Sequence, residues 1–191
     1  LPPSIDLSVP PEARTGAERL LAEAGVDPAR PLVLLAPGAA HGPAKRWPAA
    51  RFGATAEILR RNHGAAAAVV GTPADTPLAA EISASMTAPP VDLTGRTGLG
   101  DLLGLFDRAA VLLSNDSGPL HVANGLGTPV VAIFGPTDPR ATGPFRGPAR
   151  VLRTEGVPCW PCEYRICPYD HRCMAGTTAA AAARAVAEVW R

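Results

Sequence analysis

The chain has 191 residues, of which 47% are hydrophobic and 18% are charged, and it contains 22 Pro and 19 Gly. This composition excludes a highly charged disordered chain and a collagen-like or coiled-coil repeat, and the length suits one domain. The formal net charge of +1 predicts no nucleic acid and no anionic membrane surface as a partner. The sequence has neither an apolar run of about twenty residues nor a signal-peptide pattern, so the expected location is cytoplasmic.

The N-terminal part of the chain opens on Leu1 and a Pro-rich stretch of the kind that joins domains. We expect residues 1–30 to be a linker followed by a helix that leads in from a missing N-terminal domain. Residues 31–191 are expected to form the domain itself, and the chain to be part of a longer protein.

Short apolar runs bounded by Pro or Gly predict buried strands. In chain order these runs cover residues 31–37, 65–71, 91–94, 109–114, 129–135 and 149–152. Amphipathic stretches between them predict helices that begin near Pro48, Thr76, Gly98 and Ser117, and an Ala-rich helix covers 177–191. Strands that are apolar throughout and alternate with helices are typical of a parallel sheet covered on both faces. The expected fold class is therefore α/β with a doubly wound parallel sheet.

The loop after the first predicted strand, residues 37–48, is rich in small residues and carries Lys45, the only lysine of the chain. In doubly wound sheets, ligands bind beyond the carboxyl ends of the strands. Free N–H groups at a helix start and a nearby ammonium both favour an anion, so this loop suits a phosphate. Its spacing matches neither a Walker A loop nor GxGxxG, and an ordinary turn with a solvated lysine explains it about equally well.

The loop at residues 114–121 joins another predicted strand to a helix and is more specific. Asp116 can accept hydrogen bonds from sugar hydroxyls, the N–H groups of Ser117 and Gly118 suit a phosphate, and His121 falls within the first helical turn. Taken singly, these residues are explained by a helix cap and a surface histidine. Because they cluster, a binding site is the favoured interpretation.

All four cysteines lie within residues 159–173, with the spacing C-x2-C-x4-C-x5-C. This spacing permits a tetrahedral metal site, two disulfides or four reduced thiols. We rank reduced or partly disulfide-bonded structural cysteines above zinc, since the spacing matches no familiar zinc module, and we predict no bound metal. The Arg, His and Tyr side chains between the cysteines suit an anionic partner or form a solvated face.

From about residue 32 to the C-terminal helix, the chain resembles the C-terminal half of glycosyltransferase family 9, the heptosyltransferases of the lipopolysaccharide inner core. The stretches that carry the resemblance are PGAAHGPAKRWPAARFG, VVGTPAD, VDLTGRTGLGDLLGLFDRA, LLSNDSGPLHVANGLGTPVVAIFGPTDP and CWPCEYRICPYDHRCM. The resemblance implies a GT-B glycosyltransferase, in which two Rossmann-like domains face each other across a cleft. This chain is similar to the domain that holds the nucleotide-sugar donor.

The resemblance also implies roles for individual residues. Lys45 resembles the donor-phosphate lysine and Asp116 the carboxylate near the donor sugar, and these two are assigned to catalysis. Ser117, Gly118 and His121 resemble a diphosphate-binding turn. Gly38, Gly71 and Thr72 resemble positions that line the nucleotide, and Thr94 and Gly95 resemble positions near its base. The full donor-binding set implied in this way is Gly38, Lys45, Gly71, Thr72, Thr94, Gly95, Asp116, Ser117, Gly118 and His121.

The activity implied by the resemblance is inverting transfer of heptose from ADP-heptose to a lipopolysaccharide inner-core, other glycan or lipid-linked acceptor. The family's catalytic base is an Asp of the N-terminal domain, so this chain alone is expected to bind the donor without turnover. Lys45 and the amides of residues 117–118 would stabilise the departing diphosphate, so the scheme needs neither metal nor cofactor. Ala39 and Ala40 replace hydroxyl residues of some relatives, which leaves only backbone N–H contacts there. Peripheral association of the full enzyme with the inner face of the cell membrane is a further expectation.

Two alternatives use the same architecture. One is half of a nucleotide-sugar epimerase, which would need further acid and base residues from another domain. The other is a stand-alone nucleotide-binding or cysteine-anchored interaction module without catalysis. The coding sequence upstream of Leu1 would distinguish these alternatives from a transferase.

Overall fold

The computed structural model describes residues 7–162 and 164–190. Their strands form one six-stranded sheet in which every pair of neighbours is parallel, in the order β3-β2-β1-β4-β5-β6. This order is that of a Rossmann-like sheet, so the predicted α/β, doubly wound class is confirmed. The strands are β1 (Leu32–Ala36), β2 (Ala66–Val69), β3 (Val91–Asp92), β4 (Val111–Asn115), β5 (Val130–Phe134) and β6 (Ala149–Arg153).

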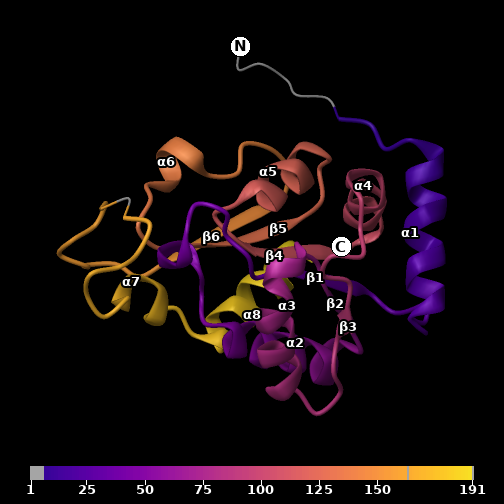
Figure 1. Cartoon of the computed structure of the whole chain (residues 1–191), viewed down its shortest axis with the longest axis horizontal. Coiled ribbons are helices and arrows are strands. Elements are labelled where there is room, and N and C mark those ends of the chain that lie inside the picture. The colour runs from indigo at the N-terminus through magenta and orange to yellow at the C-terminus, as the bar shows by residue number, and fades with distance from the viewer. Residues whose placement is uncertain (1–6, 163, 191) are drawn as a thin grey trace.

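Helices cover both faces of the sheet. In Figure 1, α2, α3 and α8 lie together on one side, α4 and α5 lie on the other, and α1 stands outside α4. No helix within the described ranges is long and apolar enough to cross a membrane. The α-helices are α1 (Pro11–Glu23), α2 (Ala49–His63), α3 (Thr76–Ala84), α4 (Leu99–Arg108), α5 (Gly118–Gly125), α6 (Pro139–Thr142), α7 (Arg172–Ala175) and α8 (Ala179–Val189), and the 3-10 helices are η1 (Pro43–Lys45) and η2 (Pro73–Asp75).

The central strands are buried on both faces, which explains their continuous apolar runs. In β1, Val33 and Leu35 join the core cluster under α2 and α8, whereas Leu32 and Leu34 join the cluster under α4 and α5. Successive side chains of a strand point to opposite faces, so one apolar strand supports both layers of helices. The sheet edge that carries the functional loops is thereby held rigidly.

Several element boundaries differ from the predicted ones, and local hydrogen bonds explain two of these differences. The third strand ends at Asp92 rather than at Thr94, because the Asp92 carboxylate accepts from the Thr94 N–H at 2.9 Å and turns the chain. The last helix starts at Ala179 rather than at residue 177, because the hydroxyl of Thr178 caps it by accepting from an N–H of the first turn. Pro48 occupies the position just before α2 rather than its first turn. Of the predicted helix, Arg191 lies outside the described residues.

Helix α1 is packed into this same body. Ala17 and Leu21 are buried in the core cluster that also contains Phe106 of α4. Gly104 of α4 allows the close approach, since a Cβ at that position would collide with the backbone of Ala13. The helix expected within residues 1–30 is therefore present at residues 11–23. That it connects to an N-terminal domain stays a prediction, and residues 1–6 lie outside the described ranges.

Candidate functional site

The loops that follow β1 and β4 lie next to each other because these two strands are neighbours in the sheet. The chain leaves β1 toward β2 and leaves β4 toward β5, so the strand order diverges here, which is where doubly wound sheets bind ligands. Asn115, at the end of β4, joins the loops: its Nδ2 donates to the carbonyl of Pro37 at 2.7 Å, and its Oδ1 accepts from the N–H of Trp47 at 3.0 Å. The loop that carries Lys45 is thus fixed against the end of β4.

Lys45 and Asp116 form a largely enclosed ion pair, with Lys45 Nζ 2.6 Å from Asp116 Oδ2 and side-chain exposures of 12% and 4%. The hydroxyl of Thr137, which follows β5, donates to the same carboxylate oxygen at 2.6 Å. His121 Nε2 lies 3.9 Å from Asp116 Oδ1, and its ring is partly exposed. The structure therefore brings together three residues predicted from the sequence and adds Thr137, which was missed because nothing in its local pattern links it to Asp116.

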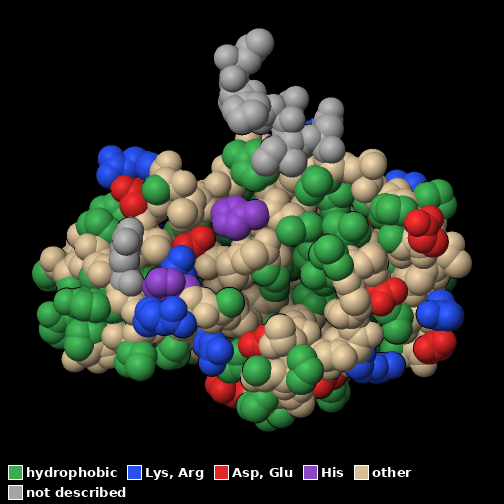
Figure 2. Space-filling view, turned by 45° about the horizontal axis from the view of Figure 1, so that its top comes forward, with side chains coloured by type: hydrophobic (Ala, Val, Ile, Leu, Met, Phe, Trp, Pro, Cys, Tyr) green, Lys and Arg blue, Asp and Glu red, His purple; other side chains and the backbone are tan. Residues whose placement is uncertain are grey.

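A cavity of about 690 Å³ opens beside this cluster, within the range that small-molecule sites occupy. Figure 2 shows a hollow near the middle of one face of the molecule, with hydrophobic side chains gathered to one side of it. Residues from four loops at the carboxyl edge of the sheet line the cavity. Six of them were predicted donor-binding residues: Gly38, Gly71, Thr72, Gly95, Ser117 and Gly118.

The other predicted residues lie beside the cavity rather than in its wall. Lys45, Asp116 and His121 form the cluster described above. The Thr94 side chain is buried, and its hydroxyl bonds the Asp92 carboxylate at 2.7 Å. Thr97, two residues after Gly95, lines the cavity in that region.

Several lining residues were not predicted from the sequence, among them Arg46, Thr97, Leu99 and Leu102. The two leucines belong to the helix that was predicted to begin near Gly98, and no binding role was predicted for them; Leu99 is 69% exposed and lines the cavity. They give the cavity an apolar wall opposite the polar loops. The helical pattern of α4 does not separate core positions from cavity positions, because both are apolar.

Asp75 is a further lining residue that the sequence reasoning missed. Its carboxylate is buried and accepts from both the N–H and the hydroxyl of Thr72 at 2.9 Å. A Cβ at Gly38 or Gly71 would lie within 3 Å of this carboxylate, so both glycines leave room for it. The sequence rule that places an acidic ribose-binding residue in such sheets starts from a GxGxxG turn, which this chain lacks, so it did not identify Asp75.

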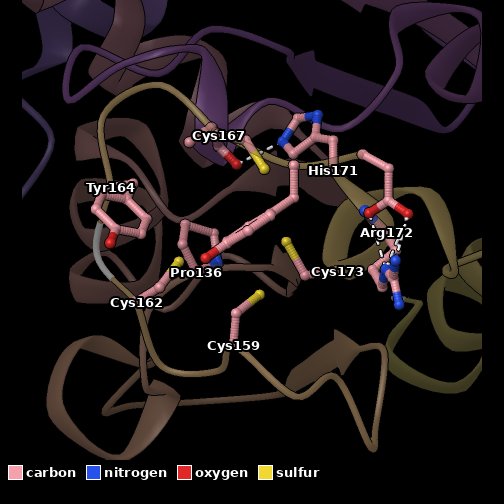
Figure 3. Close-up of a pocket in the computed structure, with 11 residues that line it drawn as sticks. Pro136, Cys159, Cys162, Tyr164, Cys167, His171, Arg172 and Cys173 are labelled. Carbon is pink, nitrogen blue, oxygen red and sulfur yellow. Dashed lines mark hydrogen bonds and ion pairs between the residues drawn. The ribbon is translucent and has the colours of Figure 1, made fainter.

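The four cysteines, all of them free thiols, surround a second, much smaller cavity of about 10 Å³ (Figure 3). Burial raises the pKa of the Cys173 thiol, and the neighbouring cysteines raise it further. No group of three His, Cys, Asp or Glu side chains in the described part of the chain is arranged to hold a metal ion. The predicted absence of a bound metal remains a prediction.

The cysteine-bearing loop contacts both segments that hold the Lys45–Asp116 pair. His171 Nε2 lies 2.6 Å from the carbonyl oxygen of Ala44, and the N–H of Ala44 donates to the carbonyl of Arg165 at 3.1 Å. The indole N–H of Trp160 donates to the carbonyl of Thr137 at 3.2 Å. Through these hydrogen bonds, the cysteine-bearing loop helps to fix the backbone at Thr137 and at Ala44, next to Lys45.

Known proteins with similar sequence and structure are heptosyltransferases. Residues 6–172 match the family model of glycosyltransferase family 9 (heptosyltransferase). The lipooligosaccharide heptosyltransferase 2 of Haemophilus influenzae is 35% identical over 128 residues, which cover 65% of this chain and 37% of that protein. The matched region is thus less than half of the length of this relative.

Solved structures of family 9 glycosyltransferases have folds similar to that of this chain. The structure of Escherichia coli ADP-heptose LPS heptosyltransferase II superposes with a TM-score of 0.81 and 26% identity, over 96% of this chain and 53% of that one. A family 9 glycosyltransferase from Veillonella parvula gives a TM-score of 0.71 and 33% identity, over 77% of this chain and 42% of that one. The fold, the paired loops at the strand ends and these similarities have one explanation: the chain belongs to glycosyltransferase family 9, the heptosyltransferase family.

Proposed function

We propose that this chain is the donor-binding domain of an inverting glycosyltransferase that transfers heptose from ADP-heptose to a lipopolysaccharide inner-core or similar glycan. The observation that carries the proposal is the cavity at the divergence of β1 and β4, with the Lys45–Asp116 pair beside it. Its volume is large enough for a nucleoside diphosphate. The similar E. coli structure, which is named as an ADP-heptose LPS heptosyltransferase, supports the choice of donor.

The diphosphate is proposed to lie against the N-terminus of α5. Ser117 and Gly118 line the cavity there, and the first N–H groups of a helix together with its dipole favour an anion. Lys45 lies within reach of the same region and would counter the charge that develops on the departing diphosphate. Asp116, held by Lys45 and Thr137, is proposed to orient the donor sugar through its hydroxyls.

The nucleoside is proposed to occupy the opposite end of the cavity. Asp75 offers a carboxylate to the ribose hydroxyls, and Leu99 and Leu102 offer apolar surface to the base. The acceptor and the base that deprotonates it are proposed to come from the remaining length of the protein, by analogy with relatives about twice as long. The cytoplasm, where nucleotide-activated sugars are made, is the proposed location.

Calorimetry with ADP and UDP tests the proposal on the 191-residue chain. We expect ADP to bind with enthalpy that can be measured at millimolar ligand or below, and UDP to bind more weakly. A folded sample that shows no ADP binding at millimolar concentration contradicts the proposal.

A matched pair of glycine variants shows whether the ligand uses this cavity. Neither Gly118 nor Gly100 has any atom within 4 Å of the place where a Cβ would stand, so both accept a larger side chain. Gly118 lines the cavity and Gly100 does not. Gly118→Leu is expected to abolish ADP binding while Gly100→Leu retains it; equal binding by the two variants would place ADP elsewhere.

A further inference from the structure

Arg46 follows Lys45 directly, yet its side chain belongs to a different part of the site. Lys45 is directed to Asp116, whereas Arg46 lines the large cavity together with Gly38, Ser117 and others. Arg46 Nε is buried and has no hydrogen-bond partner, and it is the one side-chain nitrogen or oxygen in this condition among the described residues. An unsatisfied buried donor is costly, so the protein itself does not reward this placement of the Arg46 side chain, and a role toward the cavity that the residue lines is its physical rationale.

The backbone on both sides of Arg46 is fixed. Its own N–H donates to the carbonyl of Pro43 at 3.0 Å, and the N–H of Trp47 donates to Asn115 at 3.0 Å. Trp47 is itself almost fully buried. Arg46 therefore lines the cavity from a turn whose backbone is held in place by hydrogen bonds.

The charge of Arg46 is also unneutralised. No carboxylate of the described chain lies within ion-pair distance of it, whereas Lys45 is paired with Asp116 at 2.6 Å. The Lys45–Asp116 pair carries no net charge, so it cannot by itself balance a diphosphate. Arginine stays protonated at all ordinary pH values, and its planar set of N–H donors matches the geometry of phosphate oxygens.

We propose that Arg46 is a second phosphate-binding residue, which supplies the net positive charge for the diphosphate of the donor. This inference rests on the proposed function, since it assumes that the cavity holds a nucleoside diphosphate. Arg46 binds the phosphates from the cavity wall formed by the β1 loop, opposite the N–H groups at the start of α5. Lys45 and Asp116 act at the end of the diphosphate that carries the sugar.

Isothermal calorimetry of the 191-residue chain with ADP and with adenosine tests the assignment. Arg46→Met keeps the length and apolar stem of the side chain and removes its donors and charge. We expect its ADP affinity to fall about 10- to 100-fold and its adenosine affinity to stay unchanged. Arg46→Lys, which restores the charge without the planar set of donors, is expected to recover part of the loss. The control is Arg96→Met, an exposed arginine beside Gly95 that does not line the cavity, which should bind ADP as the wild type does.

Thermal unfolding of the free proteins separates binding from structure. Arg46→Met removes an unsatisfied buried donor, so its Tm without ligand should equal or exceed that of the wild type. The increase in Tm caused by ADP should be smaller for Arg46→Met than for the wild type. Equal losses for ADP and adenosine, a lower Tm of the free variant, or unchanged ADP affinity would each overturn the assignment. Failure of the wild-type chain to bind ADP would instead contradict the proposed function, so the two failures are distinguishable.

Discussion

Asp116 is the residue on which the candidate site depends most. Its carboxylate is 4% exposed and holds Lys45 and Thr137 through one oxygen, with His121 near the other. A carboxylate taken out of water is tolerated when it is paired and hydrogen-bonded, and both conditions are met here. The same contacts fix its position, so a ligand hydroxyl would meet an oriented acceptor.

The variant Asp116→Asn tests this dependence through stability. It leaves the Lys45 ammonium largely enclosed without its counter-charge, so we expect the free energy of unfolding to fall by about 3 kcal/mol. Urea denaturation would measure the change. The control Asp170→Asn removes an exposed ion pair with Arg172 and should lower the free energy of unfolding much less, because water screens that pair. Similar effects of the two variants would show that enclosure of the Lys45–Asp116 pair contributes little.

Glu57 predicts how stability responds to acid. Hydrogen bonds from Arg60 and Thr87, and a further one from Arg61, hold the pKa of Glu57 well below its usual range. A carboxyl whose pKa is lower in the folded chain stabilises the fold above its unfolded pKa and loses that contribution as the pH falls toward the folded value. Glu57→Gln should therefore be less stable than the wild type near neutral pH, and the difference should narrow between about pH 5 and pH 2. Thermal unfolding at a series of pH values checks this; a difference independent of pH would contradict it.

At the scale of elements, the contact between α1 and α4 depends on one small residue. Gly104 stands where a Cβ would collide with the backbone of Ala13, so only glycine permits the observed approach. Gly104 lowers the intrinsic stability of α4, because a glycine inside a helix costs up to about 1 kcal/mol relative to alanine. The burial of Ala17 and Leu21 of α1 in the core cluster that includes Phe106 of α4 offsets that cost.

Two glycine-to-alanine variants of α4 should therefore change stability in opposite directions. Gly104→Ala forces α1 and α4 apart and is expected to lower the free energy of unfolding by about 1–3 kcal/mol. Gly100→Ala, which meets no atom within 4 Å, should raise it by about 0.5–1 kcal/mol through helix propensity. Chemical denaturation of both variants gives the comparison, and a stabilising Gly104→Ala would mean that α1 is not packed as described.

The loop that carries the four cysteines makes a prediction of its own about thiol chemistry. Cys173 is buried and its pKa is raised, whereas the other three cysteines are partly exposed. Since the thiolate is the reactive form, iodoacetamide should modify Cys173 last in the native chain. Mass spectrometry after timed labelling measures the order, and early modification of Cys173 would show that the loop opens.

The metal content of the same loop can be measured directly. We expect elemental analysis of the purified chain to find less than stoichiometric zinc, and a chelator to leave its thermal unfolding unchanged. One zinc per chain, lost together with local structure on chelation, would make residues 159–173 a metal-folded unit.

At the scale of the whole molecule, the parallel sheet gathers loops from distant parts of the sequence at one edge. The cavity is built from the loops after β1, β2, β3 and β4, and the Lys45–Asp116 pair draws on a residue beyond β5 as well. A ligand bound there would therefore contact most of the sheet and stabilise the fold as a unit. We expect the 191-residue chain to bind ADP but to transfer no heptose by itself, because the acceptor-activating base is proposed to lie outside it. A transfer assay with ADP-heptose and a lipopolysaccharide acceptor checks this, and turnover by the chain alone would contradict it.

The class of fold and the loops that carry the site could be predicted from the amino-acid sequence. Continuous apolar runs that alternate with amphipathic stretches predict strands buried on both faces. Successive residues of a strand point to opposite faces of the sheet, so an unbroken apolar run makes both faces of the strand apolar. Ligands of such sheets bind beyond the carboxyl ends of the strands, and the small residues and Lys45 in one loop and the clustered polar groups in the other favoured the loops after β1 and β4. Strand ends were less well predicted, since a side-chain hydrogen bond such as the one that the Asp92 carboxylate accepts from the Thr94 N–H decides where a strand stops.

Which side chains contact one another could not be predicted without the three-dimensional arrangement of the strands. Lys45 and Asp116 are 71 residues apart and pair because β1 and β4 are neighbours, and Thr137 joins them because β5 follows β4 in the sheet. Neighbouring residues also have different surroundings: the Lys45 side chain pairs with Asp116, whereas Arg46 lines the cavity. Periodicity along a chain reports which residues are buried but not which strands are neighbours or where a turn directs each side chain. Those choices depend on long-range packing, and the geometry of this site follows from them.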